Sequence, residues 1–120
     1  ASMRGRMLGE LDRGGANAFD LKHGLGGITD IEFMVQYHVL RWAGTHAALL
    51  TWTDNLRLLE TIAELGLLPA VQCRRLHDAY FAYRAELHRC ALQQIDGLVA
   101  PDRFQDQRRE VREIWDTVFA

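Results

Sequence analysis

The residues best suited to do chemistry lie in one turn near the amino terminus. Lys22 precedes a cluster of three glycines, Gly24, Gly26 and Gly27. Glycine tolerates positive φ and lets a ligand approach the backbone, and the free N–H groups of a first helical turn attract anions. The pattern therefore predicts a phosphate-binding turn formed by the Lys22 side chain and the backbone of Gly26 and Gly27. The alternative is that the glycines only let the chain turn and pack.

The residues after the glycines predict the start of a helix. Thr29 and Glu32 have the S/T-x-x-E spacing of a capping box, in which each side chain accepts from the backbone N–H of the other residue. Asp30 and Glu32 are also candidate metal ligands, because nucleotidyl transfer uses clustered carboxylates to hold divalent ions. In a helix, however, positions i and i+2 point about 200° apart, which favours capping. An extended backbone would instead favour metal binding, because the two side chains would then share one face. A further alternative is that one of the two carboxylates reaches an active site.

Other catalytic and metal-binding patterns are absent from the sequence. The histidines at positions 23, 38, 46, 77 and 88 lack HxxxH and HxxH spacing, and Cys73 and Cys90 are not a CxxC pair. Ser2 is the only serine, and no G-x-S-x-G motif occurs. We therefore assign no catalytic residue and no metal ligand. His38, on an apolar helix face, is expected to be a core residue with a satisfied ring.

The composition is that of a soluble globular protein. The chain has 120 residues, 48% of them hydrophobic and 25% charged, with a net charge of −2 and a pI near 6.2. We expect one domain over residues 1–120 and no nucleic acid partner, because the basic residues alternate with acidic ones. No apolar run reaches the roughly 20 residues needed to cross a bilayer, and no signal peptide is recognised. We expect no membrane partner, a cytoplasmic location and cysteines that are buried thiols.

Apolar spacing predicts the elements that must position this turn. Helices are expected over residues 3–12, 30–43, 54–65, 69–94 and 105–118, with a short helical turn at 46–50, a strand at 19–22 and a surface loop at 95–104. Thr53 is the expected N-cap of the third helix and Gly66 its C′ residue. The fold class is therefore all-α, a bundle of four to five mainly antiparallel helices with a Gly-rich loop near the N-terminus.

The same spacing predicts which side chains form the core. In the second helix these are Ile31, Met34, Val35, His38 and Trp42, widened by Phe33, Tyr37 and Leu40. In the longest helix the apolar seam consists of Leu76, Tyr80, Tyr83, Leu87 and Cys90. The remaining large aromatic side chains, Trp52, Phe81 and Trp115, are also expected to be core residues.

Three segments resemble one enzyme family closely. Phe19-Asp20-Leu21-Lys22, the run from Gly26 to Phe33, and the run from Trp52 to Glu60 are similar to the bifunctional glutamine synthetase adenylyltransferase and adenylyl-removing enzymes. The resemblance implies two tandem nucleotidyltransferase units, each followed by a helical domain. This chain resembles the C-terminal helical domain of the adenylyltransferase half. It lacks the family's Gly-Ser and Asp-x-Asp catalytic pieces, so the isolated fragment is expected to be inactive.

The resemblance also implies an activity and partners for the full-length enzyme. That enzyme transfers AMP from ATP, with magnesium, to a tyrosine of glutamine synthetase, and the PII signalling protein and glutamine regulate it. This domain would close one wall of the ATP site of the upstream nucleotidyltransferase domain, with Lys22, Gly26 and Gly27 near the phosphates. One alternative is a docking module that binds PII or glutamine synthetase without nucleotide contact. Another is the related helical domain of a PII uridylyltransferase, although Gln36-Tyr37 and Trp52 to Glu60 favour the adenylyltransferase.

Overall fold

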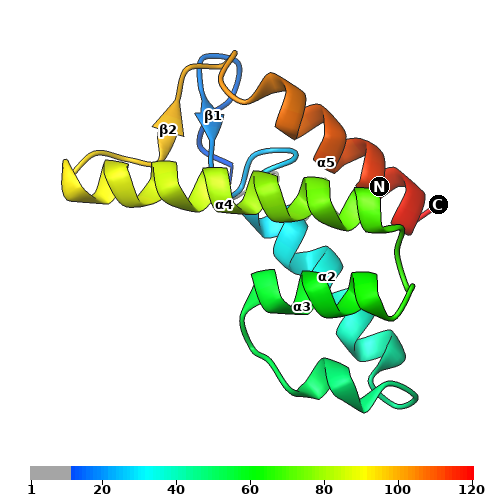
Figure 1. The fold of residues 1–120 in the computed structure, drawn as a ribbon. Helices are drawn as coiled ribbons and strands as arrows, with labels where there is room; N and C mark the ends of the chain where they lie inside the picture. The colour runs from blue at the N-terminus through cyan, green and yellow to red at the C-terminus, as the bar shows by residue number, and fades with distance from the viewer. Residues whose placement is uncertain (1–11) are drawn as a thin grey trace.

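The fold is predominantly helical, which confirms the predicted class. The structure is a computed structural model that describes residues 12–120, so the helix expected over residues 3–12 lies outside the described part. Within residues 12–120, two short strands and five helical segments follow one another (Figure 1). They are β1 (Phe19–Asp20), α2 (Ile28–Trp42), the 3₁₀ helix η1 (Ala47–Leu50), α3 (Asn55–Glu64), α4 (Ala70–Leu92), β2 (Leu98–Val99) and α5 (Gln105–Val118).

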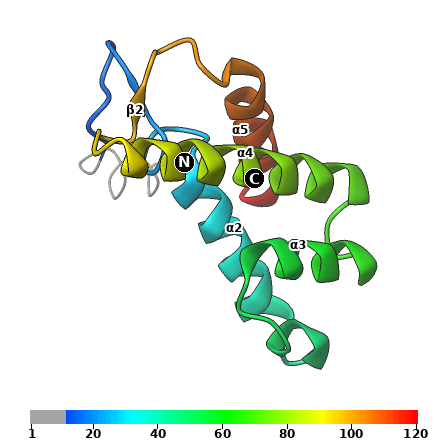
Figure 2. The ribbon, with the colours of Figure 1, turned by 60° about the vertical axis from the view of Figure 1, so that its left-hand side comes forward.

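Helix α4 is the centre of the arrangement. It runs beside α3 as an antiparallel hairpin, and α2 and α5 pack against it as well (Figures 1 and 2). The predicted seam of α4 is confirmed, because Leu76, Tyr80, Tyr83 and Cys90 are buried and Leu87 is partly buried. These side chains meet buried residues of the neighbouring helices in one core, including Ile31, Met34, Leu59, Ile62, Val111, Ile114 and Trp115.

Local backbone chemistry fixes both ends of α3. The N-cap is Asp54, whose Oδ1 accepts from the N–H of Leu56 at 2.9 Å, so the prediction of Thr53 was wrong by one residue. At the other end Gly66 has φ +72°, and its N–H donates to the carbonyl of Ala63. The N–H of Leu67 donates to the carbonyl of Ile62, which completes a Schellman motif and confirms Gly66 as the C′ residue.

The strand prediction was right for one segment and wrong for another. β1 forms at the predicted place, although it is only two residues long, and it pairs antiparallel with Leu98–Val99. We expected a surface loop at residues 95–104. A two-residue strand has no periodicity to detect, and its partner lies far away along the chain. The pairing joins the segment before the glycine turn to the connection between α4 and α5 (Figure 1).

Three side chains predicted to lie in the core are exposed. Leu40 is 83% exposed, Phe81 62% and Trp52 43%, so these predictions were wrong. Phe81 follows Tyr80 directly and therefore points away from the seam of α4, while the Arg57 guanidinium covers the ring of Trp52. His38 is buried and its Nδ1 lies 2.8 Å from the carbonyl oxygen of Met34, as expected of a satisfied core histidine.

Two further expectations concern the cysteines and the membrane. Both Cys73 and Cys90 are buried free thiols, as predicted. Within residues 12–120, none of the helices combines the length and apolar character needed to cross a bilayer.

Candidate functional site

The turn between β1 and α2 brings the three predicted site residues together. The N–H of Leu21 donates to the carbonyl of Gly97 in the β2 connection, and the N–H of Ile28 donates back to the carbonyl of Leu21, each at 2.9 Å. The first bond ties the turn to the β2 connection, and the second holds the two ends of the turn against each other. Within it the Lys22 side chain is exposed, whereas Gly26 and Gly27 are buried.

The backbone N–H groups of both glycines already have acceptors. The N–H of Gly26 donates to Oδ2 of Asp30 at 2.7 Å, and that of Gly27 donates to the carbonyl of Gly24 at 2.9 Å. A phosphate contact with either group would have to replace an internal acceptor, whereas the exposed ammonium of Lys22 needs no such exchange. The assignment of Lys22, Gly26 and Gly27 to nucleotide binding stays a prediction, and Lys22 is its best-placed member.

The predicted capping box does not form. Helix α2 begins at Ile28, two residues earlier than expected, and its N-cap Gly27 has no side-chain hydrogen bond. The N–H of Thr29 donates to the carbonyl of Lys22, and the Glu32 carboxylate accepts from the Tyr80 hydroxyl at 3.0 Å. Because the helix starts earlier, Asp30 occupies the third helical position and its carboxylate reaches back to the turn. Asp30 therefore has the role that we predicted for Glu32, in which a carboxylate accepts from a backbone N–H at the start of the helix.

Asp30 and Glu32 point to different parts of the molecule, as a helical backbone requires. Asp30 is 2% exposed and faces the glycine turn, whereas Glu32 accepts a hydrogen bond from the Tyr80 hydroxyl. That hydroxyl also accepts from Asn55 Nδ2 at 3.2 Å. Burial is the largest cause of the raised pKa of Tyr80, so this hydroxyl stays a donor to Glu32. Among residues 12–120, no three His, Cys, Asp or Glu side chains are grouped so that they could hold a metal ion.

Asp20 is a site residue that we did not predict. Its side chain is 1% exposed and accepts three backbone hydrogen bonds, from Arg13 at 3.2 Å, Lys22 at 3.0 Å and His23 at 3.1 Å. The Arg13 and His23 side chains also approach the carboxylate, at 3.9 and 3.8 Å. An aspartate directly before a glycine turn is a known signal of side-chain to backbone bonding. That signal was present in the sequence.

Gly26 has a packing role that only glycine can fill. Its φ is +79°, and a Cβ atom at this position would lie 2.5 Å from the backbone oxygen of Arg108 in α5. The Arg108 guanidinium in turn lies over the ring of Phe19 in β1, 4.1 Å from its centroid. The turn is therefore clamped between β1 and the first residues of α5.

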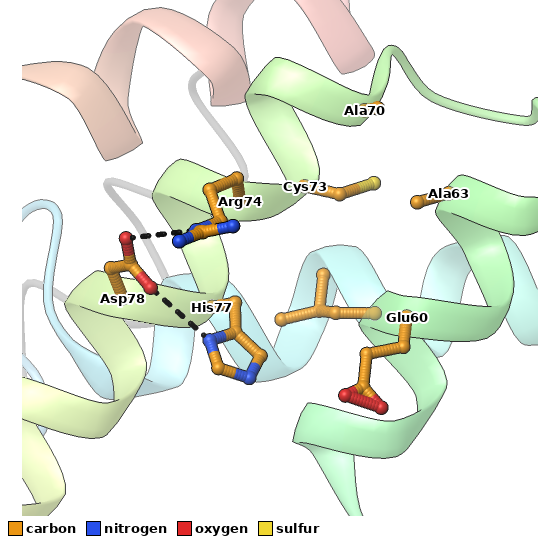
Figure 3. Close-up of a pocket in the computed structure, with 8 residues that line it drawn as sticks. Glu60, Ala63, Ala70, Cys73, Arg74, His77 and Asp78 are labelled. Atoms are coloured by element: carbon orange, nitrogen blue, oxygen red, sulfur yellow. Dashed lines mark hydrogen bonds and ion pairs between the residues drawn. The ribbon is translucent and has the colours of Figure 1, made fainter.

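A pocket lies between α3 and α4, far along the chain from the turn. It is a pocket of about 290 Å³ lined by Leu59, Glu60, Ala63, Ala70, Cys73, Arg74, His77 and Asp78 (Figure 3). Arg74 and His77 both reach Asp78, at 3.5 and 3.3 Å, while Glu60 lies opposite on α3. Arg74 and Asp78 are mostly exposed, so their pairing contributes little to stability.

The Cys73 thiol at this pocket should react slowly. Burial raises its pKa from 9.0 to about 11, and because only the thiolate is nucleophilic, about 100-fold less of it exists near neutral pH. We expect alkylation of Cys73 by iodoacetamide, followed by mass spectrometry in a Cys90→Ser background, to lag far behind that of the unfolded chain at pH 8. Equal rates in the folded and unfolded protein would contradict this expectation.

Comparison with known proteins identifies one matching family and several similar proteins. The sequence model of a family described as GlnD PII-uridylyltransferase matches residues 1–117. Proteins named bifunctional glutamine synthetase adenylyltransferase/adenylyl-removing enzyme are 57% identical over 98 residues in Pseudomonas aeruginosa, 46% over 116 in Nitrosococcus oceani and 41% over 117 in Methylococcus capsulatus. These matches cover 82%, 97% and 98% of this chain. The chain spans only 10 to 12% of the length of these relatives.

Proposed function

The chain belongs to the family described as GlnD PII-uridylyltransferase, and from that premise we propose that it is the accessory helical domain of a glutamine synthetase adenylyltransferase. The names of the relatives support the adenylyltransferase over the uridylyltransferase, since identity to the former reaches 57%. The full-length enzyme would transfer AMP from ATP to a tyrosine of glutamine synthetase. The small share of each relative that the chain spans supports an accessory role.

The observation that carries this proposal is the exposed Lys22 on a turn whose backbone is held from both sides. In the full-length enzyme the ammonium would face the upstream nucleotidyltransferase domain and neutralise part of the triphosphate charge of ATP. Gly26 and Gly27 would contribute by keeping in place the turn that carries Lys22, because their own N–H groups already have acceptors within the turn. Magnesium would be bound in the upstream domain, because residues 12–120 offer no cluster of ligands for it. The free buried cysteines support a cytoplasmic location.

Removing the Lys22 ammonium tests the proposal directly. We expect Lys22→Ala in the full-length enzyme to raise the KM for ATP by roughly 10-fold, the effect of losing one charge-assisted contact. The KM for glutamine synthetase should stay unchanged. Steady-state adenylylation at varied ATP measures both constants.

The matched control is Arg112→Ala, which removes an exposed cation from α5 and should leave the use of ATP unaltered. An unchanged KM and kcat for Lys22→Ala would remove Lys22 from the nucleotide site.

A docking role without nucleotide contact is the second candidate function. Leu40 in α2 and Phe81 and Leu92 in α4 expose 83%, 62% and 73% of their surface, and a protein partner that covered them would remove apolar surface from water. The partner would be PII or glutamine synthetase. Titrating the protein with PII, with and without glutamine, separates the two candidates. Binding to PII together with normal ATP use by Lys22→Ala would support docking, and no binding under either condition would disfavour it.

A further inference from the structure

We infer that Asp20 is a positioning residue that presents Lys22 to the nucleotide, an inference that rests on the proposed function of Lys22. Asp20 ends β1 and Lys22 follows two residues later. Oδ1 of Asp20 accepts from the N–H of Lys22 at 3.0 Å and from that of His23 at 3.1 Å. The backbone carbonyl of Asp20 also accepts from the N–H of Gly24 at 2.8 Å. One residue therefore orders the first half of the turn.

The backbone of Lys22 is held from its other side as well. Its carbonyl accepts from the N–H of Thr29 in the first turn of α2, at 2.9 Å. Asp20 is itself anchored, because β1 pairs with β2 and the Asp20 side chain is 1% exposed. The exposed side chain of Lys22 thus starts from a backbone fixed to two regular elements. Only the side-chain torsions remain to be ordered when an anion binds, which lowers the entropy cost of binding.

A charged carboxylate is needed at position 20, and an acceptor of the same shape would not replace it. Oδ2 accepts from the N–H of Arg13 at 3.2 Å and lies 3.9 Å from Arg13 Nε and 3.8 Å from His23 Nδ1. These three groups around the oxygen are all donors or potential cations. An asparagine would place its NH₂ group against these donors or lose the bonds to Lys22 and His23. Asp20→Asn should therefore weaken the hydrogen bonds that order the turn, while the size of the side chain stays the same.

The test uses Asp20→Asn in the full-length enzyme. We expect a three- to tenfold rise in the KM for ATP, an equally weakened affinity for a non-hydrolysable ATP analogue, and an unchanged KM for glutamine synthetase. The backbone N–H groups of Lys22 and His23 should exchange with deuterium faster than in the wild type. The matched control is Asp54→Asn, which alters another aspartate that accepts a backbone bond, at the start of α3. It should change none of these quantities.

A double-mutant cycle separates positioning from general destabilisation. If Asp20 acts through Lys22, adding Asp20→Asn to Lys22→Ala should raise the KM for ATP no further. A further rise in the double variant would overturn the inference. If Asp20→Asn melts too early to assay, Asp20→Ser takes its place with the same expected outcomes, because the serine hydroxyl keeps one acceptor.

The remaining outcomes distinguish the two proposals. A raised KM for Lys22→Ala with an unchanged KM for Asp20→Asn overturns the positioning role alone. An unchanged KM and analogue affinity for Lys22→Ala overturns the nucleotide role of Lys22 and the positioning role with it.

Discussion

Replacing Gly26 with alanine is expected to lower the free energy of unfolding by about 3 kcal/mol or more. The added Cβ would lie 2.5 Å from the carbonyl oxygen of Arg108 and 2.9 Å from its Cα. Both are backbone atoms of α5 and cannot move aside as the end of a flexible side chain would. The φ of +79° adds a cost of about 1 kcal/mol for any residue with a Cβ. Denaturant unfolding followed by circular dichroism measures the loss.

Gly66→Ala is the matched control for this substitution. Gly66 has a similar φ of +72°, but a Cβ there would have nothing within 4 Å. It therefore isolates the backbone cost, about 1 kcal/mol, from the collision with α5. Equal losses for the two variants would mean that the turn is not clamped against α5. In the full-length enzyme Gly26→Ala should also raise the KM for ATP, since the displaced turn carries Lys22.

Long helices were predictable because their apolar residues repeat many times. The bounds of α5 match the prediction, and those of α4 differ from it by one or two residues. The end of α3 was predictable because Gly66 acts through its own conformation and its immediate neighbours. β2 was not, since two residues carry no period and their partner lies about eighty residues earlier. Local rules suffice where the stabilising contacts are local.

The start of α2 shows why much of the site could not be predicted. Thr29 and Glu32 have the spacing of a capping box, yet the N–H of Thr29 and the carboxylate of Glu32 each bond to another partner, and that of Glu32 lies 48 residues away along the chain. The carbonyl of Lys22 accepts the N–H of Thr29, and the Tyr80 hydroxyl donates to Glu32. The exposed position of Lys22 could be predicted from the sequence. The burial of Asp20 and Asp30 could not be predicted, because it depends on the packing of β2 and α5 against the turn.

Tyr83 should show the other large effect on stability. Its side chain, on α4, is fully buried and contacts the rings of Phe19 and Phe104 at centroid distances of 5.9 and 5.3 Å. Tyr83→Ala would remove this link between β1, α4 and the start of α5. We expect a loss of roughly 3–5 kcal/mol in the free energy of unfolding, measured by denaturant titration. A loss below about 1 kcal/mol would mean that the ring does not hold these elements together.

The control, Tyr83→Phe, should not lower the free energy of unfolding. Within residues 12–120 the Tyr83 hydroxyl has no hydrogen-bond partner, although it is buried. Burial also raises the pKa of Tyr83 far above its usual value, so the hydroxyl stays protonated and its removal should have the same effect from pH 6 to pH 9. An unpaired buried hydroxyl costs about 1–3 kcal/mol, and phenylalanine keeps the ring contacts without that cost. Tyr83→Phe should therefore leave stability unchanged or raise it, whereas a clear loss would show that the hydroxyl has an acceptor in the folded protein.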